Sequence, residues 1–95
     1  MKIERTLQFA KWLDGLKDLH ARARIQARIA RLANGNPGHF RNLTGGVSEL
    51  KIDAGAGYRV YFTQRGDVLI ILLSGGSKAT QQADILKAQA MVKQL

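Results

Sequence analysis

The feature that most constrains the fold is a run of six consecutive apolar residues, Val68 to Leu73. A strand with one face in water alternates apolar and polar residues, so a short uninterrupted run predicts a central strand covered on both faces. Val47 to Asp53 and Gly57 to Thr63 read as two further strands, because the turn-like segments 54–56 and 64–67 connect all three as hairpins. The second half of the chain is therefore expected to form an antiparallel sheet.

Helical patterns flank these strands. After a short strand at Ile3 to Arg5, a first helix is expected to begin at the N-cap Thr6, and a second runs from the N-cap Asp18 to about Ala33. Residues 34–46 are rich in Gly and Asn and read as a connection, and a last helix begins at Thr80. The predicted α+β order is β-α-α-β-β-β-α, one domain over residues 1–95 with the helices packed on one face of an antiparallel sheet.

The chain is strongly basic, with 15 Lys and Arg against 7 Asp and Glu, a net charge of +8. Such a small domain usually binds a polyanion or an acidic protein, although the charge could also serve solubility alone. There is no cysteine, and the two histidines lie in unrelated segments, so no metal or other cofactor is expected. The charged start and the short apolar run indicate a cytoplasmic protein without a membrane partner.

The second helix carries a stripe of four cations. At about 100° per residue, Lys17, Arg24, Arg28 and Arg31 fall within an arc of about 60°, opposite the apolar side of the helix. A solvated face is one reading, since amphipathic helices need one. A stripe without an anion is unusual, however, because mixed signs repel each other less. We therefore expect Arg24, Arg28 and Arg31 to contact an RNA backbone or an acidic segment of a partner.

Strand alternation sorts the side chains of the sheet by face. The face expected beneath the helices carries Leu50, Ile52, Val60 and Phe62. The opposite, open face is expected to carry Lys51, Arg59 and Tyr61, with Lys78 leaning over the same patch from the end of the third strand.

Four motifs follow one another in the second half of the chain: Gly46-Val-Ser-Glu-Leu-Lys-Ile-Asp, Gly57-Tyr-Arg-Val-Tyr-Phe, Leu72-Leu-Ser-Gly-Gly-Ser-Lys and Gln81-Gln-Ala-Asp-Ile. In this order and spacing they resemble the RelE/ParE toxin superfamily of type II toxin–antitoxin systems, and within it the HigB-like addiction module killer proteins. The resemblance covers essentially the whole chain. It implies a RelE-like fold and a toxin that inhibits translation as a ribosome-dependent, metal-independent mRNA endoribonuclease. The implied partners are the ribosome, mRNA and a HigA-like helix-turn-helix antitoxin, through which the toxin meets operator DNA only indirectly.

The resemblance also implies the catalytic residues. Lys51 resembles an active-site lysine of the family, Arg59 its phosphate-binding arginine, and Lys78 takes the place of a second arginine. Attack by a 2′-OH builds negative charge on phosphorus, which fixed cations stabilise, Arg59 as a bidentate fork and Lys78 as a point charge. Lys51 could assist deprotonation. Glu49 stands where a second sheet lysine is expected and could act as a base or pair with Lys51, while Tyr61 could stack a base.

Each of these residues also has a purely structural interpretation. Arg59 could be a cross-strand partner of Asp53 or Glu49, and Lys51 could protect a strand edge. Lys78 could be a solvated loop residue, and Tyr61 a half-buried sheet tyrosine. Two other functions fit the same fold. A ParE-like gyrase inhibitor should lack a cation cluster on the sheet, and a non-catalytic co-repressor acting only with its antitoxin should be harmless when expressed alone.

Overall fold

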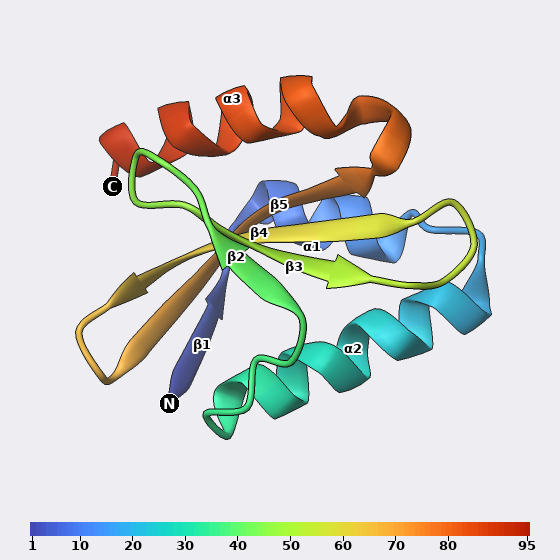
Figure 1. The fold of residues 1–95 in the computed structure, drawn as a ribbon, viewed down its shortest axis with the longest axis horizontal. Helices are drawn as coiled ribbons and strands as arrows, with labels where there is room; N and C mark the ends of the chain where they lie inside the picture. The colour runs from blue at the N-terminus through green and yellow to red at the C-terminus, as the bar shows by residue number, and fades with distance from the viewer.

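A five-stranded sheet forms the middle layer of the protein in a computed structural model that describes residues 1–95 (Figure 1). Its strands lie in the order β1-β5-β4-β3-β2. They are β1 (Lys2–Arg5), β2 (Phe40–Asn42), β3 (Ser48–Ile52), β4 (Tyr58–Arg65) and β5 (Leu69–Ser77). β1 runs parallel to β5, and the other neighbours are antiparallel. The long hairpin of β4 and β5 occupies the centre of the sheet, as the apolar run predicts.

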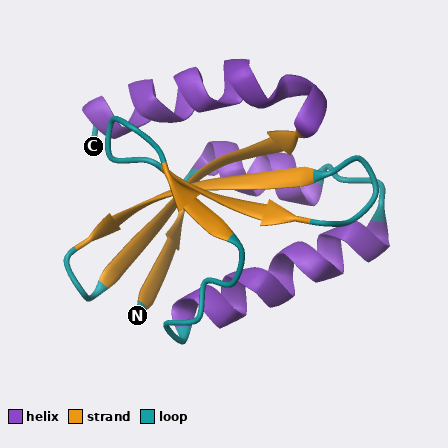
Figure 2. Ribbon diagram, viewed as in Figure 1, coloured by secondary structure: helices purple, strands orange, loops and turns teal.

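Three α-helices pack against this sheet (Figure 2). They are α1 (Leu7–Asp14), α2 (Leu19–Ala33) and α3 (Gln81–Lys93), the last preceded by a single 3-10 turn, η1 (Lys78–Thr80). The predicted N-caps are confirmed, because the side chains of Thr6 and Asp18 accept hydrogen bonds from the backbone N–H of Phe9 and Ala21, both at 3.0 Å. No helix is both long enough and apolar enough to span a membrane.

The larger core lies between one face of the sheet and the helices α1 and α2. It contains the four strand residues predicted for that face, together with apolar residues of both helices. Its fully buried members are Phe9, Leu13, Ile25, Leu32, Leu50, Ile52, Val60, Phe62, Ile70 and Leu72. The predicted face assignment is therefore confirmed.

The opposite face of the sheet is covered by α3, which crosses it on the far side from α2 (Figure 1). A second, smaller core forms there from Val47, Tyr61, Leu73 and Ala88. The α+β class and the order of the main elements are confirmed, but the helices lie on both faces rather than on one. The physical reason is in β5, whose apolar side chains point both ways and require a cover on each side.

Two features of the sheet lie outside the sequence-based expectation. The segment 34–46, expected to be a connection, contains the short strand β2, which pairs with β3. The sheet is also mixed rather than antiparallel, because β1 pairs in parallel with Leu69–Leu72. The parallel pairing joins residues far apart in sequence, and β2 is too short to show alternation. No local sequence pattern therefore predicts either pairing.

Candidate functional site

A cavity of about 360 Å³ opens on the sheet face where β2, β3 and β4 meet the start of α3. Its walls are His39, Phe40, Arg41, Glu49, Lys51, Arg59 and Gln81. Strand register explains why these residues gather. Lys51 lies directly opposite Arg59 across β3 and β4, and Arg41 lies opposite Glu49 across β2 and β3. Three of the four predicted catalytic residues therefore line one cavity.

Arg59 projects from β4 into this cavity and is only 6% exposed. Its Nη1 donates to the carbonyl of Gly57 at 2.9 Å and to that of Tyr58 at 3.4 Å. It forms no ion pair with Asp53 or Glu49, so the cross-strand pairing considered as a structural interpretation does not occur. The guanidinium is thus held in place by neutral carbonyls, and its remaining N–H donors and its full charge are available to an anion.

Glu49 lies at the base of the cavity with a side chain only 4% exposed. Its Oε1 accepts a hydrogen bond from Arg41 Nε at 2.8 Å, and its Oε2 accepts one from Gln81 Nε2 at 3.0 Å. Burial by itself raises the pKa of the Glu49 carboxyl, but the hydrogen bonds from Gln81 and Arg41 and the charge of Arg41 outweigh burial and leave the pKa below its ordinary value. Glu49 is therefore ionised near neutrality and pairs with Arg41, not with Lys51.

Lys51 stands beside Arg59 on β3, half-buried and without an ion pair. Its backbone N–H donates to the carbonyl of His39 at 3.1 Å, which brings the His39 side chain to the same cavity. β3 is flanked by β2 and β4, so Lys51 does not protect a free strand edge. Lys51 therefore lines the cavity with no carboxylate within ion-pairing distance.

Lys78 lies outside the cavity wall, exposed at the start of η1. It remains close to Arg59, because its backbone N–H donates to Gly57 at 2.8 Å and both side chains flank that glycine. Tyr61 differs more from expectation. The predicted exposed position of Tyr61 is wrong, because its side chain is fully buried beneath α3. Burial together with the Glu49 carboxylate raises the pKa of its phenol. No face of the ring is open to a base.

The arginines of α2 divide into two kinds. Arg24 and Arg31 are exposed, as predicted. Arg28 instead turns inward, and its guanidinium donates to three backbone carbonyls, those of Lys51 at 2.6 Å, His39 at 2.8 Å and Pro37 at 2.9 Å. Its expected position on a free RNA-binding face is therefore wrong, because the segment before β2 folds back over α2 and supplies acceptors that the helical pattern does not reveal.

Arg41 and Gln81 are the site residues that sequence reasoning missed. Arg41 lies in β2, within a segment read as a connection, so no alternation pointed to its face. Gln81 begins the last of the four motifs but carried no assigned role. No cluster of three or more His, Asp or Glu side chains is arranged to hold a metal ion. The chemistry that this cavity can offer is the binding of a phosphate or carboxylate by closely spaced cations.

Comparison with known proteins identifies the family of this chain. Residues 11–93 match the family described as "Phage derived protein Gp49-like (DUF891)". An uncharacterized protein of Haemophilus influenzae is 47% identical over 95 residues, which is 100% of this chain and 96% of that relative. Members of the Gp49-like family are commonly toxins of toxin–antitoxin systems. The chain therefore belongs to the Gp49-like family of phage-derived proteins, a family similar to toxin–antitoxin toxins.

Proposed function

We propose that this protein is the toxin of a type II toxin–antitoxin system and inhibits translation by cleaving mRNA on the ribosome. The observation that carries the proposal is the cavity on β2, β3 and β4, whose lining includes three cations, Arg41, Lys51 and Arg59. Two of these cations, Lys51 and Arg59, have no carboxylate partner. Buried or half-buried cations without counter-ions are costly unless an anion binds there, and an RNA phosphate is such an anion.

The geometry suits in-line attack of a ribose 2′-OH on the neighbouring phosphate. Arg59, fixed by two carbonyls, can donate a fork of N–H groups to the phosphoryl oxygens as negative charge develops on them. Lys51 adds a second charge from the neighbouring strand, and Lys78 adds a third from the rim beside Arg59. Because these cations are already in position, little reorganisation is needed when the charge develops.

Proton transfer in this cavity is assigned differently from the sequence-based hypothesis for Glu49. Both carboxylate oxygens of Glu49 already accept hydrogen bonds, so in this proposal Glu49 positions Arg41 rather than taking a proton. Lys51 and His39 line the same cavity, and their side chains are of the types that serve as general acids and bases. We assign to this pair the removal of the proton from the attacking 2′-OH and the protonation of the 5′-oxygen, which leaves as its bond to phosphorus breaks.

The partners follow from the same surfaces. The cavity is small, so we propose that the ribosome orients the mRNA while the exposed Arg24 and Arg31 of α2 contact phosphates nearby. We further propose a HigA-like helix-turn-helix antitoxin as the neutralising partner, acting in the cytoplasm and linking the toxin to operator DNA only indirectly. A net charge of +8 favours rapid encounter with both RNA and an acidic antitoxin surface.

The proposal is tested by comparing Arg59→Ala with Arg65→Ala, an exposed arginine at the far end of the same strand that lines no cavity described here. Purified protein is added to ribosomes programmed with a defined mRNA, and cleavage is mapped by primer extension. We expect the natural sequence and Arg65→Ala to cut inside the reading frame, and Arg59→Ala to cut at least about 100-fold more slowly, as for loss of one charge-stabilising donor.

The same variants separate the competing functions. Growth arrest accompanied by DNA damage with intact transcripts would identify a gyrase inhibitor. Expression without an antitoxin that leaves growth and transcripts unaffected would identify a co-repressor. Either result overturns the nuclease proposal, as does equal cleavage by Arg59→Ala and the natural sequence.

A further inference from the structure

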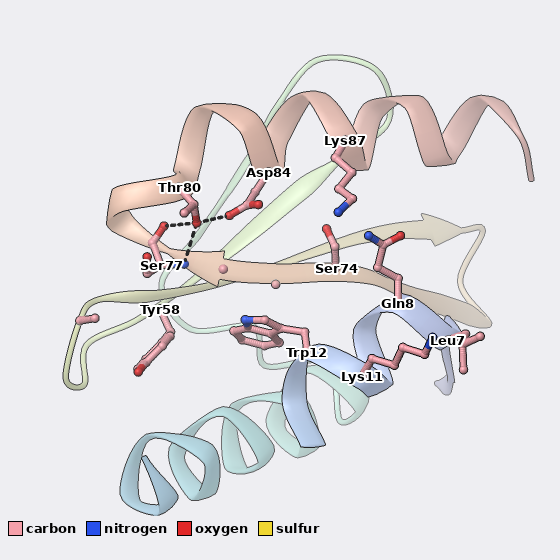
Figure 3. Close-up of a pocket in the computed structure, with 13 residues that line it drawn as sticks. Leu7, Gln8, Lys11, Trp12, Tyr58, Ser74, Ser77, Thr80, Asp84 and Lys87 are labelled. Atoms are coloured by element: carbon pink, nitrogen blue, oxygen red, sulfur yellow. Dashed lines mark hydrogen bonds between the residues drawn. The ribbon is translucent and has the colours of Figure 1, made fainter. Parts of the chain in front are cut away.

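A second and larger cavity, of about 1040 Å³, forms a groove between α1 and α3 along the end of β5 (Figure 3). It shares no residue with the candidate active site. One wall is formed by α1 with Gln8, Lys11 and Trp12, and the other by α3 with Asp84 and Lys87. The groove therefore needs an explanation of its own.

The floor of this groove is an open strand edge. β1 pairs with β5 only as far as Leu72, and at Thr6 the chain turns away into α1. From Gly75 to Ser77, β5 therefore has β4 on one side and no strand on the other. An incoming strand at this edge would continue the line of β1.

The hydrogen-bond pattern shows which backbone groups face the groove. The N–H of Lys78 donates to the carbonyl of Gly57 at 2.8 Å, so these two residues form a hydrogen-bonded pair. In an antiparallel ladder every second pair is hydrogen-bonded, and two pairs further along stands Gly76 opposite Arg59. Gly76 is therefore bonded to its partner in β4, and both the N–H and C=O of Gly75 point away from β4. The neighbouring N–H of Ser77 does so too, since it donates to Thr80 Oγ1 (Figure 3). The unpaired N–H and C=O of Gly75 are a template for strand pairing.

Two glycines let side chains from the groove walls pack closely against the end of β5. The ring of Trp12 lies directly over Gly75, and the carboxylate of Asp84 lies against Gly76, so a Cβ at either position would collide with them. Next to them, Ser74 is 4% exposed, and its hydroxyl has no hydrogen-bond partner. This hydroxyl is directed into the groove, on the side of Lys87 (Figure 3).

The charges of the groove indicate the chemistry of its ligand. Lys11 and Lys87 stand on opposite walls, and neither forms an ion pair within the chain. They favour carboxylates at intervals along a bound segment. A polynucleotide fits less well, because it cannot continue the sheet and would leave the edge groups of Gly75 unpaired.

We propose that this groove binds an extended acidic segment of a partner protein, which adds as a short strand to the open edge of β5. The backbone of Gly75 supplies the sheet hydrogen bonds, Ser74 supplies one further donor, and Lys11 and Lys87 bind side-chain carboxylates. Naming the antitoxin as the source of the segment rests on the toxin function proposed above. The binding mode itself rests only on the groove.

The experiment uses a short capped peptide of alternating glutamate and valine as the probe. Trp12 is the only tryptophan in the chain and lines the groove, so its fluorescence reports binding there. We expect a saturable change in its emission and slowed hydrogen exchange of the Gly75 amide by NMR. Lys11→Glu combined with Lys87→Glu should weaken binding at least about tenfold. The control Lys93→Glu, exposed near the end of α3 and outside the groove, should not weaken it.

Four outcomes would overturn the proposal. They are no response to the peptide, equal binding of a peptide N-methylated on alternate amides, a response to oligouridine but not to the peptide, and protection of Gly75 by self-association in sedimentation. The titration contains no ribosomes and leaves Arg59 unchanged. Its failure is therefore distinguishable from failure of the mRNA cleavage test.

Discussion

Replacing Arg28 with alanine should destabilise the protein substantially, although the helical pattern assigns this residue to solvent. Its guanidinium donates to three backbone carbonyls, which tie α2 to β3 and to the segment before β2. Hydrogen bonds to a charged group contribute at least about 1.5 kcal/mol each. Ordering the arginine side chain costs up to about 2 kcal/mol, and its Nε is buried without an acceptor. We therefore expect a net loss of about 3 kcal/mol in the free energy of unfolding.

Urea denaturation followed by circular dichroism measures this loss directly, and the midpoint of thermal unfolding should fall by roughly 12 to 24 °C. Arg24→Ala and Arg31→Ala are matched controls, because both residues are exposed on the same helix and neither donates a side-chain hydrogen bond to these carbonyls. Each should stay within about 0.5 kcal/mol of the natural sequence. Arg28→Lys should recover only part of the loss, since one ammonium group cannot reach three carbonyls in the geometry of a guanidinium fork.

The same substitution should affect the candidate active site. Arg28 binds the backbone carbonyls of Lys51 and His39, two residues whose side chains line the cavity. Arg28→Ala should therefore slow mRNA cleavage even at temperatures where the variant is fully folded. An unfolding free energy for Arg28→Ala equal to that of Arg31→Ala would refute the reasoning, because the three hydrogen bonds would then contribute nothing measurable.

Two further predictions concern Glu49 and Gly75. Because the pKa of Glu49 is lowered in the folded protein, its ionised carboxylate stabilises the fold at pH values above 4.5, the ordinary pKa of this side chain. This contribution is lost as the pH falls through the folded-state pKa. The stability difference between the natural sequence and Glu49→Gln, measured by urea denaturation, should therefore narrow below pH 4.5, whereas parallel pH profiles would contradict the pairing with Arg41. Gly75→Ala should lower stability by roughly 1–3 kcal/mol, because the new Cβ displaces the Trp12 ring, and should shift the tryptophan emission. Unchanged emission and stability would show that the ring is not held against β5.

Local patterns in the sequence were sufficient for every main element except the short strand β2. The caps Thr6 and Asp18 act within one helical turn, and the apolar run of β5 requires cover on both faces wherever it is placed. Alternation also placed Lys51 and Arg59 on one face of the sheet, where register makes them direct neighbours. These features depend on residues close in sequence or on a strict period of two, so they can be predicted without knowing the packing.

Only the tertiary structure decided how the surfaces are covered. α3 packs on the face that alternation left open, which buries Tyr61, and β2 pairs with β3, which brings Arg41 to Glu49. The inward turn of Arg28 depends on carbonyls that a distant segment supplies. A residue's own sequence neighbourhood sets which way its side chain points, whereas its neighbours in space determine whether that side meets water, a helix or another charge.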